Sequence, residues 1–206
     1  MDILHSRFAR TLEAMGLPAL PCPISALAPA ALRFQIGGKE GPYLADHRKP
    51  SGAYIQAALD RALDLYRALP QAPDLLRIDR DRAFAEDLPL SALQKLGLPE
   101  PEEVHATDSR EYFYWHLAPK PEFLRSLLRE IIRGELDAEG LDLLTSNVYF
   151  LSTDRKLLFH LYDDRGADVA AEEKEVLLPL YRDFGDWLDE SSRDQADTLF
   201  AKGLSG

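Results

Sequence analysis

The sequence predicts an α+β fold in which helices pack over a mostly antiparallel sheet of about five strands. Short runs of branched and aromatic residues are typical of strands, and longer stretches with apolar residues every three or four positions are typical of helices. Glycine and proline separate these runs. With 206 residues the chain can bury a core without disulfides, so we expect a single domain over residues 1–206, with a possible internal boundary near 99–108.

The first third of the chain combines helices with a short strand. Apolar residues at helical spacing predict an amphipathic helix over 3–15, which a proline-rich connector follows. Alternating apolar and polar residues predict a strand over 31–36. A broad apolar stripe predicts a helix over 51–69 with Ser51 as its N-cap, and Arg61, which lies off the stripe, is expected to face solvent.

The middle of the chain continues this mixture. We expect a strand over 75–78 and a short helix over 89–97. Residues 99–103 are rich in proline and glutamate and predict a stiff acidic linker. An aromatic run over 112–117 predicts a strand that is central or has one face in a binding surface. A clean apolar stripe predicts a helix over 123–132.

An acidic turn dominates the C-terminal third. Strands over 148–151 and 157–162 are expected to pair antiparallel and to lead into the turn at 163–166, and Val169 and its neighbours supply the last strand. Aspartate can bond its own backbone at the start of a turn, and glycine suits its end.

The last predicted elements are helices. A helical pattern over 174–178 meets Pro179, and an aromatic stripe continues over 180–188, so two abutting helices are expected rather than one. Ser191 or Ser192 is expected to cap a terminal helix.

The net charge of −11 is concentrated in one part of the chain. Residues 135–206 contain 17 acidic and 7 basic residues, whereas the first 134 contain 18 and 17. Such a surface repels nucleic-acid phosphates and anionic lipids, so neither nucleic acid nor membrane is an expected partner. It attracts a basic protein partner. The alternative is that the charge serves only solubility.

The location follows from what the sequence lacks. The N-terminal residues carry charges where a signal peptide would be apolar, and no run is long enough to span a membrane. The single cysteine, Cys22, excludes an internal disulfide and is expected to be a structural thiol. We therefore expect a cytoplasmic protein.

No catalytic set is evident, so an enzyme is not the favoured interpretation. The histidines are scattered and form no known motif: His5, His47, His105, His116 and His160. His116 and His160 could meet across the sheet, or each could be a satisfied core residue. Hydrolysis by paired carboxylates stays open, because a sequence does not give the separation of carboxyl groups.

The acidic turn has two interpretations. Asp163, Asp164 and Asp168, with His160 nearby, are ligands that a hard cation such as Mg²⁺ would accept. Alternatively, bonds from aspartate to the backbone and an ion pair with Arg165 hold the turn. Arg165 would compete with a metal for the carboxylates, and we expect no cofactor.

Residues 161–169, which read LYDDRGADV, resemble a bacterial family catalogued as domain of unknown function 3885. Further similar residues are Arg33-Phe34-x-Ile36-Gly37, Arg61-Ala62, Leu177-x-Pro179-Leu180-Tyr181, Trp187-Leu188, Arg193 and Phe200. Residues 190–193 depart from the pattern, which has an acidic or aromatic residue nearer Arg193. Because the activity of this family is not established, the resemblance implies an architecture and little chemistry.

Two functions follow as hypotheses. The first is a non-enzymatic protein-binding domain, concretely an immunity protein that neutralises a bacterial toxin by occluding its basic active-site cleft. The residues expected to bind this partner are Asp163, Asp164, Arg165, Asp168 and Trp187. The alternative is a metal-dependent hydrolase whose ligands are the three aspartates.

Overall fold

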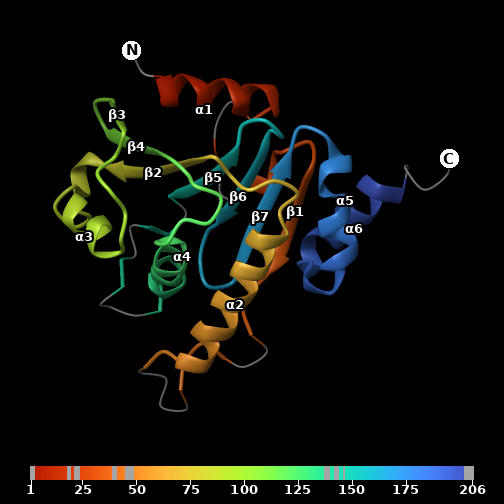
Figure 1. Cartoon of the computed structure of the whole chain (residues 1–206). Coiled ribbons are helices and arrows are strands. Elements are labelled where there is room, and N and C mark those ends of the chain that lie inside the picture. The colour runs from red at the N-terminus through yellow and green to blue at the C-terminus, as the bar shows by residue number, and fades with distance from the viewer. Residues whose placement is uncertain are drawn as a thin grey trace.

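A seven-stranded sheet lies at the centre of the computed structural model, which describes residues 3–17, 20, 24–38, 41–44, 49–136, 140–141, 144–145, 147 and 148–201 (Figure 1). All neighbouring strands are antiparallel, in the order β1-β7-β6-β5-β2-β4-β3. The strands are β1 (Ala31–Gln35), β2 (Leu75–Asp81), β3 (Glu103–Ala106), β4 (Arg110–His116), β5 (Val148–Ser152), β6 (Leu157–Leu161) and β7 (Gly166–Ala171). The predicted α+β class is confirmed, and the sheet is larger than the expected five strands.

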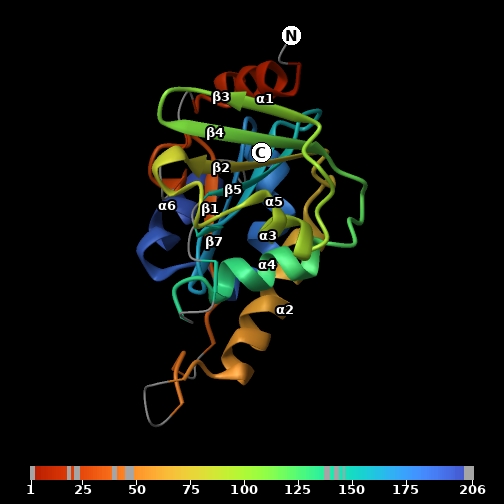
Figure 2. The same cartoon turned by 90° about the vertical axis from the view of Figure 1, so that its left-hand side faces the viewer.

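Helices cover both faces of the sheet. Figure 2 shows α1 above the strands and α4 and α2 below them. The helices are α1 (Ile3–Ala14), α2 (Gly52–Ala68), α3 (Leu90–Lys95), α4 (Leu124–Arg133), α5 (Lys174–Asp183) and α6 (Glu190–Ala201), and the short 3₁₀ turns include η1 (Ile24–Ala26), η2 (Arg82–Phe84) and η4 (Gly185–Trp187). The sheet is therefore the middle of three layers.

The two faces of the sheet differ in chemistry because successive strand residues point to opposite sides. The face packed against α2, α4, α5 and α6, called here the α2 face, is apolar. Its largest strand side chains are Phe34, Phe113, Trp115, Phe150 and Phe159. The opposite face, called the α1 face, receives the apolar side of α1, namely Leu4, Phe8 and Leu12, and Met15 just after the helix.

A row of polar and aromatic side chains crosses the α1 face from edge to edge. From β1 to β3 this polar row consists of Arg33, Asp168, His160, Tyr149, Arg77, Tyr114 and Glu103. Burying such groups costs free energy unless each finds a partner. Pairs along the row provide partners: Arg33 Nε lies 2.9 Å from Asp168 Oδ1, and the ring of Tyr149 stacks on His160 with centroids 4.8 Å apart.

Strand β3 was not predicted. Its residues fall in the segment interpreted as a stiff linker and a possible boundary, 99–108, yet β3 pairs with β4 in the same sheet. Glu103 explains why the segment is ordered: its carboxylate accepts hydrogen bonds from the backbone nitrogens of Leu4 (2.7 Å) and His5 (2.8 Å). An acidic residue here caps the distant helix α1.

Helix α2 begins as predicted, because the Tyr54 backbone nitrogen donates to the Ser51 side chain at 3.3 Å. Arg61, however, does not simply face solvent. Its Nη1 donates to the Gly37 carbonyl oxygen at 2.9 Å, and its guanidinium lies 5.3 Å from the centre of the Trp187 ring. The apolar stripe alone could not reveal these two tertiary partners.

The two predicted helices around Pro179 are one helix. Pro179 lies inside α5 on the exposed side, while Leu177 and Leu180 remain buried on the core. A proline in a helix interior costs about 3 kcal/mol, and burial of these leucines offsets that cost. The predicted serine cap of α6 is also wrong, because Asp189 accepts the hydrogen bond from the Ser191 backbone nitrogen at 3.0 Å.

The predictions for Cys22 and for membrane-spanning helices depend on which residues the structure describes. Cys22 lies outside them, as does part of the proline-rich connector. Within the described part of the chain, none of the helices has the length and apolar character that crossing a bilayer requires.

Gly166, at the start of β7, offers a test of the packing around the turn. A Cβ there would lie 2.9 Å from the Phe34 carbonyl oxygen and 2.7 Å from Cζ of Tyr162. We expect Gly166→Ala to lower the free energy of unfolding by about 1 to 3 kcal/mol in urea denaturation. The added methyl group is too close to the Phe34 carbonyl oxygen, so β7 and β1 must move apart to accommodate it. Gly185→Ala is the control, since nothing lies within 4 Å of its Cβ position. An equal effect of both changes would contradict this account.

Candidate functional site

The carboxylate of Asp163 holds the acidic turn between β6 and β7. Its Oδ1 accepts from the backbone nitrogens of Arg165 at 2.7 Å and Gly166 at 3.2 Å, and its Oδ2 accepts from Arg165 Nε at 2.7 Å. Arg165 Nη2 donates to the same oxygen. Only 2% of Asp163 is exposed. The turn is therefore stabilised by the backbone bonds and ion pair that one of the two sequence interpretations describes.

Asp164 points toward helix α2, where the Tyr54 hydroxyl donates to its Oδ2 at 2.8 Å. Burial raises the pKa of the Asp164 carboxyl above its ordinary value, and the hydrogen bond from Tyr54 opposes part of this rise. The neighbouring charge of Asp163 raises it further. Asp164 thus connects the turn to α2 while its ionised form is disfavoured.

Arg165 forms the outer surface of the turn. Its side chain is 68% exposed, and its Nη2 lies 3.6 Å from Glu135 Oε2. A protein that reached this turn would contact Arg165 and Glu135 before either buried aspartate.

The turn also contains a group of carboxylates close enough to hold a cation. Among the described residues, ligand atoms of Glu135, Asp163 and Asp164 lie within 4.8 Å of one another. Asp168 is not part of this group. A cation would have to displace Arg165 from Asp163, so the guanidinium already supplies the positive charge that the carboxylates need.

Asp168 lies on the α1 face, away from the turn, and is completely buried. It accepts from Arg33 Nε at 2.9 Å and Nη2 at 3.3 Å, and from the backbone nitrogen of Ser25 at 3.2 Å. The guanidinium of Arg33 in turn lies 4.7 Å from the ring centre of Tyr162. Asp168 therefore joins β1, β7 and η1 through a buried ion pair.

Trp187 lies in η4, between α5 and α6. It is partly buried: its ring contacts Phe184 edge to face, with centroids 5.0 Å apart, and receives Arg61 over its face. A chain of contacts links Trp187 to the acidic turn. Arg61, which lies over its ring, donates to the Gly37 carbonyl oxygen, and the Gly37 backbone nitrogen donates to the Arg165 carbonyl oxygen at 3.2 Å.

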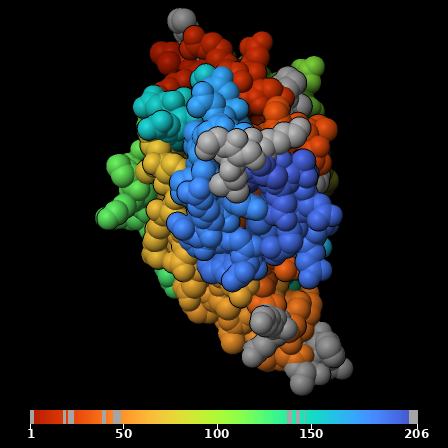
Figure 3. All heavy atoms as spheres, turned by 90° about the vertical axis from the view of Figure 1, so that its right-hand side faces the viewer, coloured from red at the N-terminus to blue at the C-terminus, as the bar shows by residue number. Residues whose placement is uncertain are grey.

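Exposed carboxylates gather on the outer helices. The acidic face, defined by its eight exposed members, consists of Glu172, Glu173, Glu175, Asp183, Asp186, Glu190, Asp194 and Asp197. Residues 172–197 contain only three basic residues, and two of these are tied to backbone carbonyls, Lys174 to Leu199 and Arg193 to Leu188. Helices α5 and α6 form the continuous blue surface in Figure 3. Eight of the seventeen acidic residues of 135–206 are thus exposed on α5, α6 and the residues beside them.

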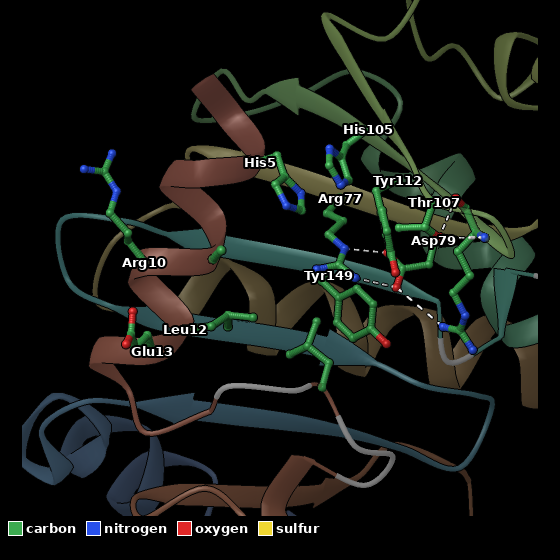
Figure 4. A pocket seen from close by; sticks show the side chains of 13 residues that line it. His5, Arg10, Leu12, Glu13, Arg77, Asp79, His105, Thr107, Tyr112 and Tyr149 are labelled. Atoms are coloured by element: carbon green, nitrogen blue, oxygen red, sulfur yellow. Dashed lines mark hydrogen bonds and ion pairs between the residues drawn. The ribbon is translucent and has the colours of Figure 1, made fainter. Parts of the chain in front are cut away.

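A cleft beside α1 was not predicted. It measures about 730 Å³ and lies between α1 and the β3–β4 hairpin, with Arg77, Asp79, Tyr112 and Tyr149 on its floor (Figure 4). We call it the α1 cleft. The ring of His5 stacks on that of His105 at its rim, with centroids 3.7 Å apart.

A sequence signal for this cleft exists in the polar residues at alternate strand positions. Arg77 and Asp79 alternate with apolar residues of β2, and His105 and Tyr112 occupy facing positions on β3 and β4. Such alternation identifies one face of the sheet. It does not reveal that α1 covers only part of that face, because helix placement depends on tertiary contacts.

Of the two alternatives for His116 and His160, a meeting across the sheet does not occur. His116 is exposed and pairs with Glu102 at 2.8 Å, whereas His160 is buried on β6 against Tyr149. Strands β5 and β2 separate their two strands in the sheet.

Comparisons with known proteins agree with the resemblance seen at residues 161–169. The sequence model of the family described as Domain of unknown function (DUF3885) matches residues 13–192, which include all seven strands and the acidic turn. The uncharacterized protein YnaE of Bacillus subtilis (strain 168) is similar, with 27% identity over 100 residues. That alignment spans 45% of this chain and 46% of YnaE, less than half of the relative's length. No solved structure matches the chain.

Two isosteric changes separate the roles of the buried aspartates. Asp168→Asn should lower the free energy of unfolding by about 3 to 5 kcal/mol, because it leaves the charge of Arg33 poorly paired in a buried site. Asp164→Asn should be neutral or stabilising at pH 7, because it removes a carboxylate whose charge burial disfavours. Urea denaturation of both variants at pH 7 measures the difference.

The pH dependence provides a second measurement. Because the folded state raises the pKa of Asp164 above 3.8, its contribution to stability is greatest below that pH and is lost as the pH rises through the folded value. The wild type should therefore lose stability relative to Asp164→Asn between acidic and neutral pH. A parallel pH dependence of the two proteins would contradict the assignment.

Proposed function

The chain belongs to the family described as Domain of unknown function (DUF3885), and we propose that it acts in the cytoplasm as an immunity protein. In this proposal it is a non-enzymatic domain that neutralises a bacterial toxin by covering the toxin's basic active-site cleft. The acidic face carries the proposal, because eight exposed carboxylates on adjacent elements complement a cationic cleft.

The acidic face combines charge with an apolar anchor. Trp187 is partly exposed within it, and aromatic residues of this kind often supply much of the binding energy at the centre of an interface. Charges around such an anchor accelerate association and select the partner. The face thus offers both affinity and specificity for a basic protein.

The acidic turn contributes to this function mainly by stabilising the fold. Arg165 is the exposed residue of the turn, whereas Asp163, Asp164 and Asp168 act through the fold by fixing β1, β7 and α2. In the proposed complex, direct contacts come from the acidic face and Trp187, with Arg165 and Glu135 at the margin.

Affinity purification of the tagged protein from its own host, at low and then high salt, tests this proposal. We expect the wild type to retain a stoichiometric basic protein at low salt and to release it at high salt. Four isosteric changes on the acidic face should reduce retention about tenfold or more. They are Glu173→Gln, Glu175→Gln, Asp183→Asn and Asp186→Asn.

A control variant with the same change in net charge shows whether binding depends on where the carboxylates lie or only on the total charge of the protein. It carries Glu86→Gln, Asp87→Asn, Asp108→Asn and Glu122→Gln, four exposed positions outside the acidic face. This control should retain the partner as the wild type does. Expression of the captured protein alone should arrest growth, and co-expression with the wild-type chain should restore it. Equal retention by both variants, or a harmless captured protein, would overturn the proposal.

Metal-dependent hydrolysis is the alternative, and the proximity of Glu135, Asp163 and Asp164 favours it. Calorimetric titration with Mg²⁺, Mn²⁺ and Zn²⁺ distinguishes the two functions. Under the immunity proposal no stoichiometric binding is expected, because Arg165 already pairs with Asp163. Stoichiometric binding that Glu135→Gln removes would instead favour the hydrolase.

A further inference from the structure

The lining of the α1 cleft has more basic than acidic side chains, unlike the chain as a whole. Three arginines and two histidines line it, against two acidic residues, although the whole chain has a net charge of −11. Its basic members are Arg10, Arg77, Arg110, His5 and His105, and its acidic members are Asp79 and Glu13. A hollow with cationic walls in an acidic protein concentrates small anions.

Two of the three arginines are poor candidates to bind a ligand, because Arg77 is paired with Asp79 and Arg10 points away from the cleft. Arg77 is mostly buried and donates to both carboxylate oxygens of Asp79, at 2.5 and 2.7 Å. Its guanidinium also lies 4.4 Å from the ring centre of Tyr112. Arg10 extends away from the floor of the cleft (Figure 4). Its Nε donates to the Ser6 carbonyl oxygen on the same helix.

The guanidinium of Arg110 has N–H donors available to bind a ligand. Within the described part of the chain its guanidinium makes a single ion pair, with Asp79 at 4.0 Å, and its side chain is 50% exposed. Asp79 bonds Arg77 at 2.5 and 2.7 Å, whereas its 4.0 Å separation from Arg110 is too long for a hydrogen bond. A guanidinium has five N–H donors in a planar fork that fits carboxylate and phosphate groups.

The hairpin fixes the backbone of Arg110 beside the cleft. Its backbone nitrogen donates to the Thr107 hydroxyl at 3.0 Å, and its carbonyl oxygen accepts from the Thr107 backbone nitrogen at 2.8 Å, so the β3–β4 hairpin is closed at its tip. The buried pair of Arg77 and Asp79 makes a rigid floor beneath it. An anion that entered would meet the guanidinium of Arg110 on a backbone that the hairpin already fixes, so only the side chain has to be ordered on binding.

We propose that the α1 cleft binds a small organic anion, whose carboxylate or phosphate group pairs with Arg110. The volume of about 730 Å³ suits a metabolite-sized molecule. The stacked rings of His5 and His105 lie at the rim, where they lie close to the remainder of the ligand. This site is separate from the acidic face and does not depend on the immunity function.

Calorimetric titration of the full chain with inorganic phosphate and with citrate, each to about 10 mM, tests the site. We expect at least one of these probes to bind with a stoichiometry of one, and the stronger probe identifies the preferred group. Arg110→Gln should weaken binding about tenfold or more. Nuclear magnetic resonance signals of the His5 and His105 rings should shift on binding in the wild type, because both rings line the cleft.

Two further variants keep the test independent of the hairpin. Arg125→Gln removes an exposed arginine from α4 on the other side of the sheet and should bind as the wild type does. Ala9→Trp fills the cleft from α1 without changing a charge and should abolish binding. Failure of both probes to bind, equal weakening by Arg110→Gln and Arg125→Gln, or unchanged binding by Ala9→Trp would each overturn the proposal.

Discussion

Burial of both faces of the central sheet is the constraint on which the rest of the structure depends. Every residue of β5, β6 and β7 is buried, so a polar side chain on these strands costs free energy unless it finds a partner inside the protein. The pair of Arg33 and Asp168 meets this requirement at one end of the polar row, and Glu103, which caps α1, meets it at the other. Helix α1 is thereby positioned by polar bonds as well as by its apolar side.

The sequence allowed the fold class and most elements to be predicted, because alternation and helical spacing are local signals. Where the prediction failed, a distant contact decided the outcome. Strand β3 has few apolar residues, and its order depends on pairing with β4 and on Glu103, whose partners lie about a hundred positions earlier in the chain. Pro179 breaks local rules, yet two leucines buried on the core keep α5 continuous.

The candidate site shows the same division between local and distant information. The bonds of Asp163 with the next residues of the turn follow from the turn sequence itself. Asp168 lies only five residues after Asp163 but on the α1 face, where it pairs with Arg33. This placement follows from the strand register, which no local pattern specifies. The α1 cleft escaped prediction for the same reason, since its walls come from a helix and a hairpin far apart in sequence.

The pairing of β1 with β7 has a consequence for how the chain folds. Arg33 and Asp168 are 135 positions apart, so β1 leaves the ribosome long before β7, with which it pairs, is made. Until then its edge is open to any other strand, a state that favours aggregation. Closing such a long loop costs conformational entropy, so we expect this sheet to fold slowly. We therefore expect the pairing of β1 with β7, and with it the ion pair of Arg33 and Asp168, to form late in folding.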